Sequence, residues 1–75
     1  MGYGFHFESP GLTYYEICEE EEGIRSKLET LAKNYCRNGN VCVGEVLFFE
    51  AGERNILSAY EYSFKDGELI TEELN

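Results

Sequence analysis

One segment of the chain, residues 24–39, spaces its apolar residues in a way that is typical of an α-helix. They recur at steps of four, three and four and so fall on one side of a helix: Ile24, Leu28, Leu31 and Tyr35, a stripe that Ala32 and Cys36 widen. Lys33 and Arg37 suit the negative end of such a helix, and Asn38-Gly39 supplies a left-handed stop. We therefore predict one amphipathic helix that ends near this pair.

The segments around this helix read as strands, because apolar and polar residues alternate in them or because they are rich in strand-forming residues. In chain order, the expected strands are residues 3–8, 13–18, 41–50, 56–65 and 68–74. Pro10 and Gly11 occupy the central positions of a type II turn, and Asp66-Gly67 is typical of a hairpin loop. The predicted fold is α+β: a small, mainly antiparallel sheet in the order β-β-α-β-β-β, with one amphipathic helix packed on one face.

Two details of this sheet are open. A two-residue first loop would place Phe5 opposite Glu16, which conflicts with a shared apolar face, so we expect a looser connection. Residues 41–50 are apolar on both faces. Either Gly44 marks a bulge that resets the alternation, or another chain covers the second face. Residues 51–55 are expected to form a loop.

Length and charge limit the classes of function. The chain has 75 residues, which suits a single domain over residues 1–75. Fifteen acidic and six basic residues give a formal charge of −9, which repels phosphate backbones and anionic lipid. Direct binding of nucleic acid or of a membrane is therefore disfavoured, and a basic protein partner is favoured. Solubility alone is the alternative explanation of this charge.

The charge is unevenly distributed along the chain. Residues 1–23 hold six acids and no base, residues 24–37 four bases and one acid, and residues 38–75 eight acids and two bases. The helix is therefore cationic. Since it covers one face of the sheet, we expect much of the acid on the opposite face, on loops and on edges.

Seven strand residues are predicted to form a partner-binding surface on that opposite face. They are the glutamates Glu16, Glu45, Glu61 and Glu72 and the tyrosines Tyr14, Tyr60 and Tyr62. Aromatic rings anchor protein interfaces, and carboxylates pair with the Arg and Lys of a basic partner. A sharper hypothesis is that the carboxylates replace nucleic-acid phosphates. The alternative is an ordinary solvated sheet face.

The sequence contains no recognisable catalytic, cofactor or metal motif. Its three cysteines, Cys18, Cys36 and Cys42, lack CxxC spacing and are expected to be buried reduced thiols. Together with His6 they match no known zinc pattern, and the acidic surroundings of His6 and Cys18 oppose an activated thiol. The run of glutamates at 19–22 lacks calcium-loop spacing. We predict no enzymatic activity, no cofactor and no metal.

The chain is expected to be cytoplasmic. Its first eleven residues lack the basic region and apolar core of a secretory signal. The longest apolar run, residues 41–49, is too short to span a bilayer.

The predicted function is that of a small acidic binding protein that inhibits or regulates a basic macromolecule, such as a nucleic-acid-binding protein or a nuclease complex. In size and charge the chain is similar to small acidic inhibitors of phages and mobile elements, including anti-restriction, anti-CRISPR and antitoxin-like proteins. No motif matches any one family. The alternative function is a self-associating assembly module with no inhibitory role, and a homodimer is compatible with both.

Overall fold

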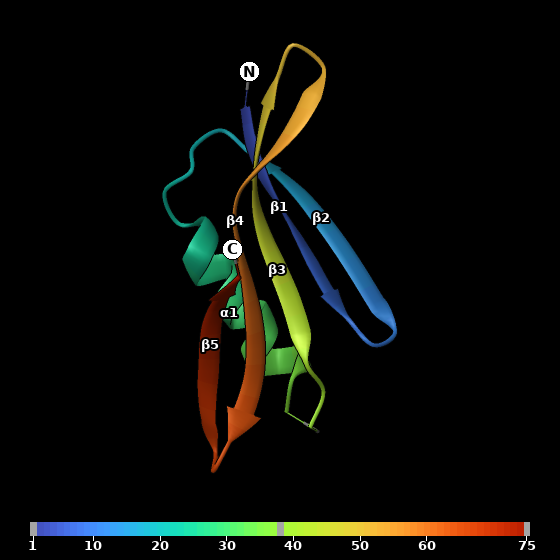
Figure 1. Cartoon of the computed structure of the whole chain (residues 1–75), viewed down its shortest axis with the longest axis vertical. Coiled ribbons are helices and arrows are strands. Elements are labelled where there is room, and N and C mark those ends of the chain that lie inside the picture. Colours follow the sequence, from blue (N-terminus) through green and yellow to red (C-terminus); the bar gives the residue numbers. More distant parts are fainter. Residues whose placement is uncertain (1, 38, 75) are drawn as a thin grey trace.

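The computed structural model describes residues 2–37 and 39–74, which form one sheet and one helix (Figure 1). The elements are β1 (Gly2–Ser9), β2 (Leu12–Cys18), α1 (Ile24–Tyr35), β3 (Cys42–Glu50), β4 (Glu53–Lys65) and β5 (Glu68–Leu74). The five strands are antiparallel to their neighbours in the spatial order β2-β1-β3-β4-β5. The predicted α+β fold and element order are confirmed.

The buried stripe of the helix is narrower than the predicted one. Ile24, Leu28 and Ala32 are buried and continue to the capping residue Cys36, whereas Leu31 is half-buried and Tyr35 is 44% exposed. The backbone N–H of Cys36 donates to the carbonyl of Ala32 and closes the helix at Tyr35. The helix thus ends before the predicted stop, of which Asn38 lies outside the described residues.

All three hairpins have two-residue loops. In the loops Ala51-Gly52 and Asp66-Gly67 both residues have positive φ, the conformation that matches the twist of antiparallel strands. The predicted loop at residues 51–55 is therefore wrong, because β4 already begins at Glu53. The first loop, Pro10-Gly11, is equally short, and it places Phe5 opposite Glu16. The looser connection expected from the sequence is also wrong.

The core lies between α1 and three strands of the sheet. Its sheet side is formed by Phe5, Phe7, Cys42, Val46, Tyr60 and Tyr62. Gly44 lies beneath the helix: a Cβ there would stand 2.9 Å from Cδ2 of Leu28. Gly44 therefore allows close helix–sheet contact and does not mark a bulge. The bulge is in β4, where Leu57 is the extra residue between the pairs Val46–Ser58 and Leu47–Ile56.

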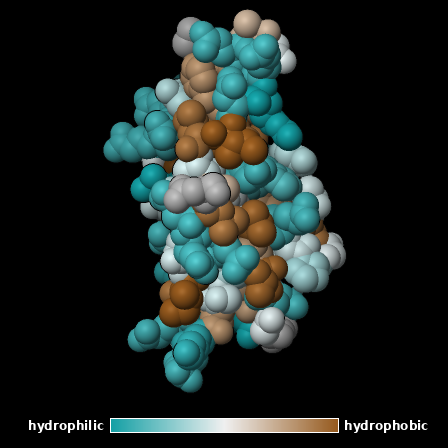
Figure 2. Space-filling model, viewed as in Figure 1, coloured by the Kyte–Doolittle hydropathy of each residue, from teal (hydrophilic) through white to brown (hydrophobic). Residues whose placement is uncertain are grey.

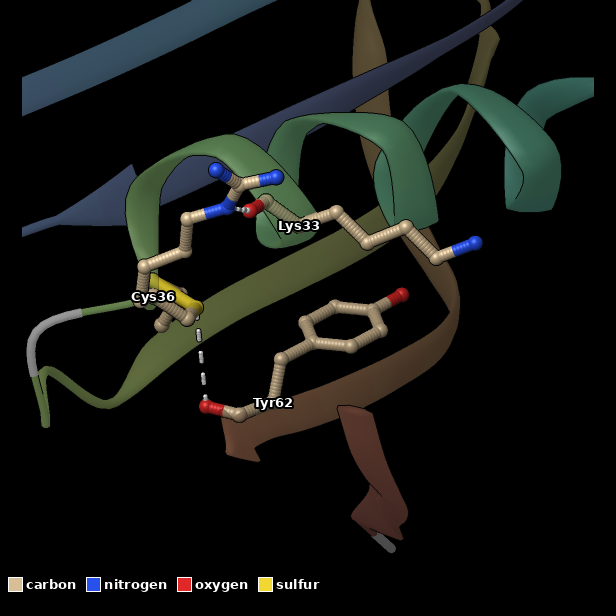
Figure 3. The surroundings of a disulfide bond; sticks show 5 residues. Lys33, Cys36 and Tyr62 are labelled. Carbon is tan, nitrogen blue, oxygen red and sulfur yellow. Dashed lines mark hydrogen bonds between the residues drawn. A yellow bond between two sulfur atoms is a disulfide. The ribbon is translucent and has the colours of Figure 1, made fainter. Parts of the chain in front are cut away.

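A disulfide joins Cys36 at the end of α1 to Cys42 at the start of β3 (Figure 3). Both residues are fully buried, as predicted, but they are not reduced thiols. The two residues are six apart in the chain, and their Cα atoms lie 6.2 Å apart. The sulfur of Cys36 also lies 3.8 Å from the carbonyl oxygen of Tyr62. The bond therefore ties the helix to the middle strand of the sheet, and Cys18 is the free cysteine.

Candidate protein-binding surface

The face of the sheet that points away from α1, termed here the open face, has no element packed on it among the described residues. Phe5 and Phe7 point into the core, so the alternate residues Gly4, His6 and Glu8 belong to the open face. Their cross-strand partners share that face. In the view of Figures 1 and 2 the strands pass in front of the helix, and brown apolar patches lie among teal hydrophilic side chains.

An apolar row crosses four strands of the open face and consists of Ile17, Gly4, Leu47 and Ile56, which pair in that order. Ile17 is 73% and Ile56 54% exposed. Leu47 is buried although it is not part of the main core. Phe49 and Ile17 approach each other over Gly4, at 3.1 and 3.5 Å from the position that a Cβ would occupy. This end of the open face is therefore a small second apolar cluster, most of which faces solvent.

An acidic row lies four residues farther along the strands and consists of Glu8, Glu61 and Glu72. Glu8 pairs with Val43, Val43 with Glu61, and Glu61 with Glu72. No Lys or Arg of the described residues forms an ion pair with these three side chains. Like charges directly opposite each other destabilise a sheet. The Glu61–Glu72 pair therefore leaves an uncompensated negative charge on the open face.

His6 occupies the middle of the open face between the two rows. Its Nδ1 lies 2.9 Å from Oε1 of Glu45 and its Nε2 lies 3.5 Å from Oε1 of Glu8. The ring stacks on Tyr15, with centroids 4.6 Å apart. Within residues 2–37 and 39–74 no group of His, Cys, Asp and Glu side chains is arranged to hold a metal ion. Burial raises the pKa of the free thiol of Cys18, which disfavours its thiolate.

The predicted glutamates divide between the two sides of the sheet. Glu45, Glu61 and Glu72 lie on the open face, as expected from alternation. Glu16 lies on the helix side, where Nζ of Lys27 donates to its Oε2 at 2.7 Å. The hydroxyl of Tyr14, on the same side, donates to Oε1 of Glu16. These bonds, the one from Lys27 above all, lower the pKa of Glu16.

The predicted tyrosines do not lie on the open face. Tyr60 and Tyr62 belong to the core, because the residue between them, Glu61, takes the open side. The Arg25 guanidinium lies 5.4 Å from the centre of the Tyr60 ring, whose buried hydroxyl has no hydrogen-bond partner in the described part of the chain. Burial raises the pKa of Tyr62 to about 12. The placement of Tyr14, Tyr60 and Tyr62 predicted from the sequence is therefore wrong.

Sequence reasoning missed most of the apolar side chains that characterise this surface. Those on the open face or at the bulge that are exposed are Tyr15, Ile17, Ile56, Leu57, Ile70 and Leu74. A hollow of about 320 Å³ lies among them at the bulge, with Ile56, Leu57 and Leu74 in its wall. The available signal was the alternation Tyr15-Glu16-Ile17, in which an apolar pair shares the face opposite to Glu16.

Comparison of the chain with protein families, curated proteins and solved structures finds no match. The helix α1, the one helix of the described residues, lacks the length and the apolar composition needed to cross a membrane.

Proposed function

We propose that this protein is a small, non-enzymatic binding protein that docks a basic protein through its open face and thereby inhibits or regulates it. The observation that carries the proposal is the acidic row, in which Glu61 and Glu72 lie directly opposite each other and form no ion pair with a Lys or Arg of residues 2–37 and 39–74. An Arg or Lys from a partner placed between them relieves their repulsion, and it forms charge-assisted hydrogen bonds.

The distribution of the cations supports the same proposal. Four of the six basic residues belong to residues 24–37, on the other side of the sheet. Lys27 is paired there with Glu16, and Arg25 lies over the Tyr60 ring. A partner that approaches the open face therefore meets the acidic row while the cationic helix is on the far side. Proteins that bind nucleic acid carry many Lys and Arg for phosphate contacts, and in the cytoplasm they are the partners that fit this face best.

Affinity capture with matched variants tests the proposal. The immobilised protein is exposed to a cytoplasmic lysate at low and at high salt, and the captured proteins are identified by mass spectrometry. The row variant carries Glu61→Lys and Glu72→Lys. The control carries Glu21→Lys and Glu22→Lys, which change the net charge equally but lie in the loop before α1.

The wild type and the loop control are expected to capture the same basic nucleic-acid-binding protein, and the row variant is expected to lose it. Capture weakens in high salt, because screening shortens the range of exposed charges from about 10 Å at 0.1 M to about 3 Å at 1 M. Undiminished capture by the row variant would refute the role of the acidic row.

The apolar row favours a second candidate, a self-associating assembly module with no inhibitory role. Ile17 and Ile56 expose apolar area to solvent. Exposed apolar patches are typical of surfaces that another molecule covers. Failure to capture any basic protein, combined with self-association in solution, would support this candidate over the first.

A further inference from the structure

We propose that two copies of this chain pair through their apolar rows, so that their open faces overlap over about half their length. The inference deepens the second candidate function and rests on it, because it specifies how the apolar row pairs; it needs no basic partner. Its starting point is the exposure of Ile17 and Ile56 on either side of Leu47, which is already buried outside the main core. A covering layer would therefore bury the two isoleucines and would add no burial at Leu47.

The size of the row sets the strength expected of such a dimer. On one side of the row β1 extends by two residues, β2 by one, and β3 and β4 by three, so the copies overlap over five or six residues per strand on average. With strands about 4.8 Å apart and about 3.3 Å per residue, the overlap is roughly 350 Å² per copy. The total of about 700 Å² is below the ~1,000 Å² of a stable interface, so the dimer is weak and transient, and each copy is folded on its own.

The charges on the open face select the orientation. The twofold axis is placed along the apolar row, which runs across the strands. A residue on one side of the row in one copy then faces the position at the same distance on the other side of the row in its partner. Arg54 lies two residues before Ile56, on the open face opposite Phe49. It is thereby placed next to the partner's carboxylates beyond the row. Those are Glu45, which lies two residues from Leu47 on the side of the row away from Arg54, and Glu61 in the acidic row.

The same rotation leaves most of the two acidic rows uncovered. The row carrying Glu8, Glu61 and Glu72 falls opposite the region beyond the start of β1, where only the β3–β4 hairpin continues. That hairpin projects past the remainder of the sheet (Figure 1), and the molecule measures 42 × 21 × 20 Å. The dimer accordingly presents two acidic ends that point in opposite directions.

Sedimentation equilibrium of the purified chain alone tests the pairing up to about 1 mM, because an interface below the usual size limit gives a weak dimer. The test variant carries Ile17→Thr and Ile56→Thr, which keep β-branched side chains on the strands and remove apolar area from the row. The matched control is Ile70→Thr. Ile70 is also exposed on the open face, at 43%, but lies on β5 beyond the acidic row. Circular dichroism checks that each variant is folded.

The wild type and the Ile70→Thr control are expected to dimerise equally. The row variant is expected to lose about tenfold or more in association constant, since both copies contribute the altered contacts. Arg54→Glu is expected to weaken the dimer severalfold, and Arg54→Glu combined with Glu61→Arg to restore it.

A wild type that remains monomeric at the highest concentration overturns the proposal. A folded row variant that dimerises like the wild type, or a control that is weakened as much as the row variant, also overturns it. If the row variant does not fold, the two charge variants decide: equal association by wild type, Arg54→Glu and the double reversal overturns the proposed orientation.

Discussion

The contact between the helix and the sheet at Gly44 can be tested by a double-mutant cycle with Leu28. In Gly44→Ala the added methyl carbon would stand 2.9 and 3.2 Å from the two terminal carbons of Leu28 and 3.1 Å from Cε2 of Tyr62. The disulfide holds the end of the helix to the strand that carries Gly44, so the helix has little freedom to lift. We expect overpacking to lower the free energy of unfolding by about 1–3 kcal/mol.

Leu28→Ala has the opposite defect. Leu28 is fully buried, and its loss leaves a cavity at the place where the Gly44→Ala methyl would be crowded. The single change is expected to cost about 3 kcal/mol, within the range of 2–5 for such substitutions. A chain of this length has a total stability of about 4–11 kcal/mol, so the variant is still expected to fold. In the double variant the methyl fills part of the cavity, and the summed cost should fall by about 1–2 kcal/mol.

Urea unfolding followed by circular dichroism measures all four corners of the cycle. With a slope of about 1 kcal/mol/M for a protein this small, the coupling shifts the midpoint by about 1–2 M relative to additivity. Gly4→Ala supplies the control. The added Cβ would point to the open face and stand 2.7 Å from the backbone carbonyl oxygen of Glu16. Leu28 lies on the other side of the sheet, so Leu28→Ala does not remove this steric clash. Effects of Gly44→Ala and Leu28→Ala that add to within about 0.5 kcal/mol would refute the reasoning.

Three further predictions concern single contacts. Replacing Cys36 and Cys42 by alanine should lower the free energy of unfolding by about 2 kcal/mol, from the entropy of a closure between residues six apart, and an unchanged urea midpoint would contradict this. Tyr60→Phe removes a buried hydroxyl that has no partner among the described residues and should raise stability by about 1 kcal/mol in the same assay, whereas a loss would show that the hydroxyl is satisfied. Because the Lys27 hydrogen bond lowers the pKa of Glu16, the stabilisation from their pairing is present at neutral pH and is lost as the pH falls below about 4. Lys27→Met should raise the pKa of Glu16 in an NMR titration, and an unchanged pKa would exclude Lys27 as the cause.

The alternation of apolar and polar residues was enough to predict the order of the elements and the face of several strand residues. It placed Glu45, Glu61 and Glu72 on the open face because each strand side chain points opposite to its neighbour. It failed for Glu16, whose partner Lys27 comes from the helix and makes a carboxylate acceptable on the helix side. Such a contact depends on the position of the helix over the sheet, which spacing along a strand does not reveal.

Two other errors arose from local readings that the surroundings override. The polar segment Glu53, Arg54 and Asn55 has the composition of a loop, but it belongs to β4. The β3–β4 hairpin extends past the helix (Figure 1), so this part of the strand has no helix to pack against and polar side chains are acceptable there. The pairing of Cys36 with Cys42 follows from the proximity of the end of α1 to the start of β3, and counting cysteines does not predict it.

Leu57 gives β4 two alternation patterns, one on each side of a single extra residue. Ile56 and Ser58 would share a side in a regular strand, yet here they point in opposite directions. A shortened chain without Leu57 would pair as an unbroken ladder and keep every other side chain on its present side. Deletion of Leu57 would therefore remove the local twist of the bulge and keep the same polar and apolar side chains on each face of the sheet. A substitution at Leu57 would leave the extra residue in place.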